Sequence, residues 1–160
     1  VVGAAGNSGS TQRHYPAAFD EVIGVTSVNE QNDRSSFANY GTWVNMAAPG
    51  EGIRSTIVSA EGSGYATWSG TSMAAPFVSG AAALVRQLNN GASSRFVSQQ
   101  LISSGSEISA SAGFGLLPSW PLLDAGAAVA AVPEDSTPPV DNPPSDNSNS
   151  FGIFVPFFHQ

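Results

Sequence analysis

The sequence contains neither cysteine nor lysine. Its five basic residues are all arginine, set against twelve acidic residues for a net charge of −7. The lack of cysteine excludes disulfides, thiolate nucleophiles and cysteine-ligated metals. The few, scattered basic residues argue against nucleic acid or an anionic membrane surface as a partner. No apolar run approaches the roughly 20 residues of a membrane-spanning helix, and only two histidines, His14 and His159, are present as bases.

What the sequence does contain is typical of a folded domain, with 160 residues of which 41% are hydrophobic and 11% charged. Short β-branched runs predict buried strands at residues 1–5, 22–28 and 44–48. Two more strands are predicted at residues 53–58 and 65–69, joined by a Gly-Ser-Gly turn at residues 62–64.

Helical spacing of apolar residues predicts a helix over residues 73–88, ended by Asn-Asn-Gly. Its many alanines and few charges indicate close packing against a sheet. Two shorter helices with polar N-caps are predicted after it, one capped by Ser93 or Ser94 and running through residues 101–102, the other capped by Asp124 over residues 125–131.

The composition divides the chain into three parts. Residues 1–132 carry the predicted helices and strands. Residues 133–150 hold five of the eleven prolines together with acidic residues, which predicts an extended, disordered linker. Residues 151–160 are apolar but too short to cross a membrane, so we expect them to begin a truncated segment.

Residues 68–76, Trp-Ser-Gly-Thr-Ser-Met-Ala-Ala-Pro, place one hydroxyl between a turn and an alanine-rich helix. Proline is tolerated in a first helical turn, so Pro76 predicts that the helix has only just begun there. Ser72 then lies among backbone N–H groups without helical partners, which favour negative charge. Two roles for Ser72 follow, a nucleophile or an N-cap.

Residues 70–76 resemble the nucleophile motif of the subtilisin-like serine proteases, the subtilases of peptidase family S8. Further segments resemble this family in the expected order: Ala-Ala-Gly-Asn at residues 4–7, Ser-Phe-Ala-Asn-Tyr-Gly at 36–41, and Met-Ala-Ala-Pro-Gly at 46–50. The resemblance covers about residues 1–132. It implies a three-layer α/β fold with a mostly parallel sheet, of which this chain is the C-terminal half.

The resemblance also implies roles for individual residues. Ser72 would be the nucleophile and Asn7 an oxyanion donor, while Ala4, Ala5 and Gly6 would form a wall of the S1 substrate pocket. Judged from its own segment alone, an asparagine in Gly-Asn-Ser-Gly is more often a turn residue than an oxyanion donor.

The chain departs from the family pattern in its histidines and aspartates. In the family the order is Asp, His, Ser, but His14 lies in a loop outside the expected motif and His159 lies in the tail. Asp20, Asp33 and Asp124 likewise lack the triad context and suit turns or caps. We therefore expect the triad Asp and His to lie upstream of residue 1, which we interpret as a cut end.

A second departure is the segment Leu-Pro-Ser-Trp-Pro-Leu-Leu at residues 117–123, where the family has no such insertion. An inserted surface loop is expected here. Trp120 would either cover the edge of the domain or serve as a contact point.

The implied function is a secreted serine endopeptidase acting on proteins or peptides, with the isolated chain inactive for want of its N-terminal half. The alternative is a catalytically silent binding or structural module derived from a subtilase. No cofactor is certain. Calcium enters only by family analogy, through carbonyls near Ala17 and Phe19 with Asp20, and no metal ligand is assigned.

Overall fold

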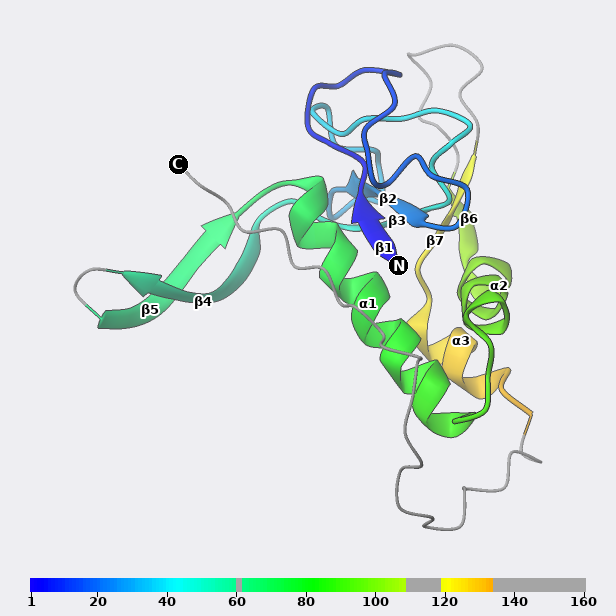
Figure 1. The fold of residues 1–160 in the computed structure, drawn as a ribbon. Helices are drawn as coiled ribbons and strands as arrows, with labels where there is room; N and C mark the ends of the chain where they lie inside the picture. Colours follow the sequence, from blue (N-terminus) through cyan, green and yellow to red (C-terminus); the bar gives the residue numbers. More distant parts are fainter. Residues whose placement is uncertain (60–61, 109–118, 134–160) are drawn as a thin grey trace.

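A computed structural model of the chain describes residues 1–59, 62–108 and 119–133. Five strands form one sheet, parallel between its first four strands and antiparallel only at the last pair (Figure 1). This confirms the predicted mixed α/β fold with a mostly parallel sheet. In order across the sheet the strands are β1 (Val2–Ala4), β2 (Ile23–Val28), β3 (Met46–Pro49), β7 (Trp120–Leu122) and β6 (Ser106–Ile108).

Three helices pack against one face of this sheet: α1 (Thr71–Leu88), α2 (Ser94–Ser104) and α3 (Ala125–Ala130). Helix α1 contacts β1, β2 and β3, as its alanine-rich sequence predicted. Its buried side is built from small residues, including Ala74, Val78 and Ala81, which meet Val25 and Met46 of the sheet. Small side chains let the helix backbone lie close to the strands.

The caps of the two shorter helices are confirmed. The Ser93 hydroxyl accepts a hydrogen bond from the Phe96 N–H at 3.1 Å, so α2 begins where the sequence predicted. The Asp124 carboxylate accepts from the Ala127 N–H at 2.8 Å and caps α3. Each bond satisfies a backbone donor that has no partner inside its helix.

A two-stranded antiparallel hairpin, β4 (Ile53–Ser59) and β5 (Gly62–Trp68), projects from the sheet just before α1 (Figure 1). The predicted turn at residues 62–64 is wrong, because Gly62 pairs with Ser59 and Ser63 with Val58 inside the hairpin. Gly62 has φ +118°, a conformation that glycine adopts readily. Gly62 is therefore the first residue of strand β5 and not part of the turn.

The expected surface loop at residues 117–123 is also wrong where the structure describes it. Residues 120–122 form β7, which pairs with both β3 and β6. Trp120 is buried, and its indole N–H donates to the Gly41 carbonyl at 3.2 Å. It packs in a second core cluster, formed by Ala5, Val28, Val44, Ala47, Ile108 and Trp120, so the alternative in which Trp120 covers the domain is the one observed. Pro121 obscured this strand, because proline is atypical of strand interiors.

Residues 109–118 and 134–160 lie outside the described residues, and with them almost all of the predicted linker and the whole apolar tail. Within the described part of the chain, no helix combines the length and apolar character needed to cross a bilayer.

The core makes a direct prediction about two leucines. Leu101 is fully buried between the helices, whereas Leu84 on α1 is 50% exposed. We expect Leu101→Ala to lower the free energy of unfolding by about 2–5 kcal/mol, since it leaves a cavity. Leu84→Ala should cost about 1 kcal/mol or less. Urea unfolding followed by tryptophan fluorescence measures both, and equal losses would contradict this assignment of the core.

Candidate active site

Asn7 and the start of α1, 64 residues apart in the sequence, are joined by two hydrogen bonds. The Thr71 N–H donates to the Asn7 Oδ1 at 2.9 Å, and the Thr71 hydroxyl donates to the same oxygen at 3.0 Å. Asn7 follows the carboxyl end of β1, and Ser72 is the next residue of α1. The two predicted site residues therefore lie together at the carboxyl edge of the sheet, where α/β proteins bind ligands.

These bonds fix the direction of the Asn7 amide. A backbone N–H can only donate, so the Asn7 atom facing Thr71 must be the oxygen. The Asn7 NH₂ group is then the end turned away from Thr71. It lies beside Gly70, where an added Cβ would be 3.3 Å from Nδ2. A side chain at Gly70 would press on this donor, so the glycine keeps space around the amide.

Thr71 is fully buried and connects the beginning of α1 to the loop that follows β1. Its hydroxyl accepts from the Gly6 N–H at 3.0 Å while donating to Asn7. The sequence motif contains Thr71, but sequence reasoning assigned it no role. Its partners are 64 and 65 residues away, beyond any local pattern.

Ser72 is not a helix cap, so that alternative is wrong. The N-cap of α1 is Gly70, no side chain caps it, and Ser72 is half-buried in the first turn. The helix begins two residues earlier than predicted, which places Pro76 in its second turn. Because proline has no N–H, it cannot bond to the Ser72 carbonyl four residues before it. The hydroxyl of Ser72 remains beside the positive end of the helix dipole.

The predicted S1 wall lies next to Asn7. Ala4 is the last residue of β1, and Gly6 bonds to Thr71. Ala5 is fully buried in the second core cluster, and its N–H donates to the Val25 carbonyl at 2.9 Å. The Ala5 side chain therefore supports the core, and the substrate-binding role of this segment stays a prediction.

Among the candidate acids and bases, His14 lies beside the loop that carries Asn7. His14 is exposed and its ring lies against Gly6, where an added Cβ would be 3.2 Å from the ring Cγ. Asp124 caps α3, and Asp20 is exposed in the segment before β2. His159 is outside the described residues. Within the described part, no three His, Cys, Asp or Glu residues group together as metal ligands would.

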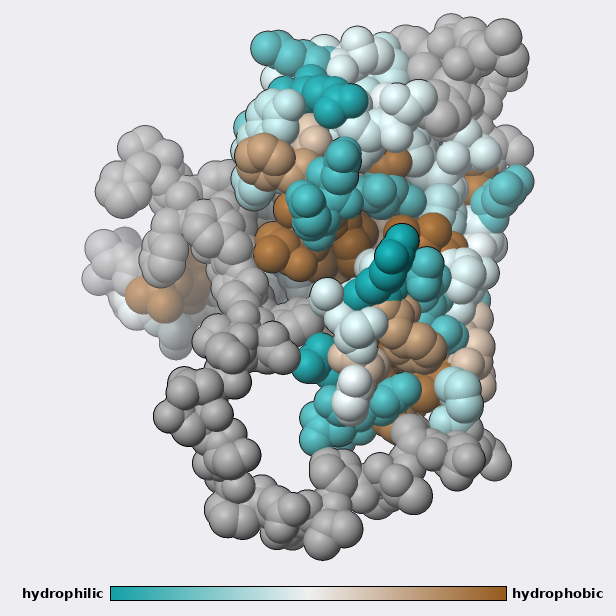
Figure 2. Space-filling model, turned by 45° about the vertical axis from the view of Figure 1, so that its right-hand side comes forward, coloured by the Kyte–Doolittle hydropathy of each residue, from teal (hydrophilic) through white to brown (hydrophobic). Residues whose placement is uncertain are grey.

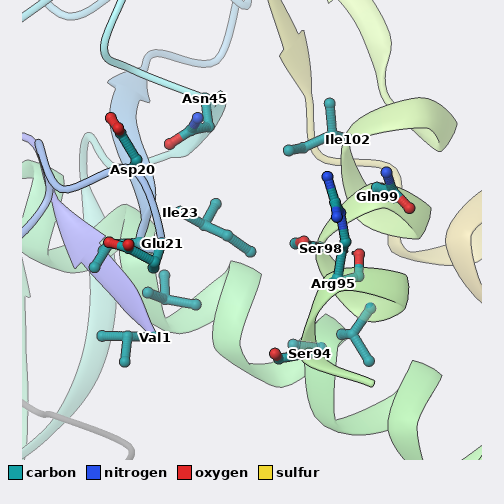
Figure 3. A pocket seen from close by; sticks show the side chains of 14 residues that line it. Val1, Asp20, Glu21, Ile23, Asn45, Ser94, Arg95, Ser98, Gln99 and Ile102 are labelled. Carbon is teal, nitrogen blue, oxygen red and sulfur yellow. Dashed lines mark hydrogen bonds between the residues drawn. The ribbon is translucent and has the colours of Figure 1, made fainter. Parts of the chain in front are cut away.

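A cavity of about 430 Å³ opens at the other end of the sheet. In Figure 3, Asp20 and Glu21 lie on one wall, and Arg95 and Ser98 of α2 lie on the facing wall. Val1 and Ile23, at the amino ends of β1 and β2, also line it. The cavity and Ser72 are therefore separated by the length of the strands, and the cavity is not part of the candidate site.

Comparison with known proteins identifies the family. The model of the subtilase family matches residues 1–131. The chain belongs to the subtilase family. This subtilase chain is 52% identical over 85 residues to the thermophilic serine proteinase of Bacillus sp. (strain AK1), covering 53% of the chain and 20% of that protein. It is 46% identical over 89 residues to subtilisin BL of Lederbergia lenta, covering 56% of the chain and 32% of that protein.

Solved structures support the same family. A protease of Pseudoalteromonas arctica PAMC 21717 superimposes on the subtilase chain with a TM-score of 0.72 and 33% identity. The match covers 81% of the chain and 42% of that structure. The chain thus spans less than half the length of each of these relatives.

The glycine next to Asn7 gives a test of the site's geometry. Gly6 has φ +98°, and a Cβ there would lie 2.7 Å from the Asn39 Nδ2. Gly62 has φ +118° with no atom within 4 Å of an added Cβ. We expect Gly62→Ala to cost about 1–2 kcal/mol of backbone strain. Gly6→Ala should cost about 1–3 kcal/mol more through crowding. Equal shifts in the urea midpoint would show that Gly6 is not crowded.

Proposed function

We propose that this chain is the C-terminal half of the catalytic domain of a serine endopeptidase, which hydrolyses peptide bonds of proteins through an acyl-enzyme. The observation that supports it best is the Asn7 amide, held by Thr71 beside Ser72 at the start of α1. A nucleophile next to an oriented donor is the arrangement that acyl transfer requires.

In this mechanism the Ser72 Oγ attacks the carbonyl carbon of the peptide bond. The carbonyl oxygen gains negative charge as the tetrahedral intermediate forms. The Asn7 NH₂ group and the Ser72 N–H donate to that oxygen. Because the two Thr71 bonds already orient the Asn7 amide, little reorganisation is needed when the charge develops.

The proton of Ser72 needs a base from outside this chain. A triad histidine accepts it and returns it to the leaving amine, and an aspartate orients the histidine. In this proposal both lie in an N-terminal half of the catalytic domain. The chain spans less than half of its relatives, which leaves room for such a half.

Three surfaces of the chain suit contact with that half. Sheets normally protect their edge strands from solvent, and β1 is the outer strand among those described. Helix α1 carries an outward apolar stripe of Phe77, Leu84 and Leu88, each about half exposed. The hairpin exposes 51% of Trp68. On the face drawn in Figure 2, an apolar area lies at the centre and is flanked by hydrophilic areas.

The alternative function is a binding or structural module that does not cleave. It is favoured for the isolated chain because the sequence contains neither the His-Gly-Thr nor the Asp-Thr-Gly or Asp-Ser-Gly segment expected around the triad His and Asp. The two proposals are compatible if this chain does not cleave peptides alone but does so when joined to the other half of the catalytic domain. Extracellular action is part of the first proposal and rests on the family resemblance.

Calcium has little support from the residues present. The Phe19 carbonyl accepts from the Val22 N–H, and the Ala17 carbonyl faces Gly24. Calcium takes about six to eight oxygen ligands, so these two carbonyls and Asp20 supply only part of a coordination shell, and calcium binding stays a prediction from the family resemblance. No step of the proposed mechanism uses a metal.

Substitution of Ser72 tests the nucleophile. The chain is joined to the preceding half of the subtilisin BL catalytic domain, and hydrolysis of a peptide substrate is measured. Ser72→Ala should lower kcat by about 10⁶-fold, a magnitude known from a subtilisin. Ser69→Ala is the matched control, because that hydroxyl accepts from the Gly52 N–H at the base of the hairpin. Turnover retained by Ser72→Ala would refute the assignment.

An active-site probe tests the need for the missing half. A serine without its base is a poor nucleophile, so the isolated chain should not be labelled by an organophosphonate. The completed domain should be labelled at Ser72, as detected by mass spectrometry of the modified peptide. Labelling of the isolated chain at Ser72 would mean that this chain supplies its own base.

A further inference from the structure

Asn39 is a buried side chain whose polar contacts converge on the loop that carries Asn7. It is 3% exposed and lies between β2 and β3. Its Oδ1 accepts from the Ser8 N–H at 2.9 Å and from the Ser10 N–H at 3.3 Å. This one oxygen atom therefore holds the backbone of the loop after Asn7 at two positions, Ser8 and Ser10.

The main chain of Asn39 holds the other side of Asn7. Its N–H donates to the Gly6 carbonyl at 2.9 Å. Its own carbonyl accepts from the Thr26 hydroxyl at 2.8 Å, and Thr26 is fully buried on β2. Asn39 thus connects both neighbours of Asn7 to the interior of the sheet.

This loop requires such support because its sequence is intrinsically pliable. Gly6 and Gly9 both have positive φ, +98° and +60°, and glycine gives the unfolded loop many alternatives. The segment that bears Asn39 is itself well held. The Arg34 guanidinium donates to the carbonyls of Ser35 and Ala38 and stacks 4.5 Å over the Tyr40 ring.

We propose that Asn39 is a positioning residue for the oxyanion donor Asn7, a role that rests on the proposed function. Asn39 fixes the backbone at Gly6 and Ser8 from one side, and Thr71 holds the Asn7 Oδ1 from the other. Between these supports the Asn7 NH₂ group keeps one direction. Asn39 does not touch the reacting atoms and acts only through Asn7.

The first test uses the isolated chain and does not depend on an activity measurement. Asn39→Leu keeps the approximate volume but removes the acceptor for Ser8 and Ser10. Hydrogen–deuterium exchange at residue resolution follows the Thr71 N–H, which is protected by its bond to Asn7. We expect its protection to fall by about 10-fold, the loss of one net hydrogen bond. Asn39→Asp, which keeps the acceptor oxygens, should retain most of the protection.

Asn45→Leu is the matched control. The Asn45 Oδ1 also accepts from a backbone N–H, that of Gly24 at 2.6 Å, but at the amino end of β2. This variant should lower protection at Gly24 and leave Thr71 unchanged. Unchanged Thr71 protection in Asn39→Leu, or an equal loss in Asn45→Leu, would overturn the positioning role.

The second test uses the completed catalytic domain. Asn39→Leu should lower kcat by about 10- to 100-fold, because small misplacements of catalytic groups have effects of this size. KM should change little, since Asn39 does not contact substrate. Asn7→Leu alone should cost about 100- to 1,000-fold, as for a lost oxyanion donor in a subtilisin.

A double substitution separates positioning from general destabilisation. If Asn39 acts through Asn7, adding Asn39→Leu to Asn7→Leu should lower kcat by less than about 2-fold more. If kcat of the double variant falls by the product of the two single losses, the positioning role is refuted while the proposed function stays intact. An inactive unsubstituted domain would instead refute the proposed function, and the exchange experiment would still decide whether Asn39 orients Asn7.

Discussion

The candidate site depends on the buried hydroxyl of Thr71. It accepts from the Gly6 N–H and donates to the Asn7 Oδ1, so it joins the end of β1 to the beginning of α1. These bonds form only if the helix lies close to the sheet. The alanines on the buried side of α1, among them Ala74 and Ala81, allow that approach. Core packing and site geometry are therefore set by the same small side chains.

The two ends of the sheet have different properties. At the carboxyl edge, Thr71 and Asn7 are paired with one another, and the Asn7 NH₂ group and the Ser72 hydroxyl are the two groups to which the proposed function assigns chemistry. At the amino edge, a cavity with an acidic wall at Asp20 and Glu21 faces a basic residue, Arg95. In the proposed function, the outer strand β1 and the apolar stripe on α1 are surfaces for contact with the other half of the catalytic domain.

The sequence predicted what local patterns encode. Ser93 and Asp124 marked two helix starts correctly because a cap is a bond between residues three apart. Pro121 concealed β7, since a proline within a strand contradicts the usual pattern. The nearness of Ser72 to Asn7 followed from motif resemblance rather than from residue chemistry. Asn39 could not be found this way, because its partners lie 29 and 31 residues away with no periodic signal.

Two hydrogen bonds close the base of the β4–β5 hairpin. The Gly70 N–H donates to the Gly50 carbonyl at 2.8 Å, and the Gly52 N–H donates to the Ser69 hydroxyl at 3.0 Å. A Cβ on Gly50 would lie 2.7 Å from the Gly70 carbonyl, so this junction accepts no larger residue. These two hydrogen bonds tie the base of the hairpin to the entry of α1. A substitution at this base would therefore reach Ser72 through Gly70, the residue that begins the helix.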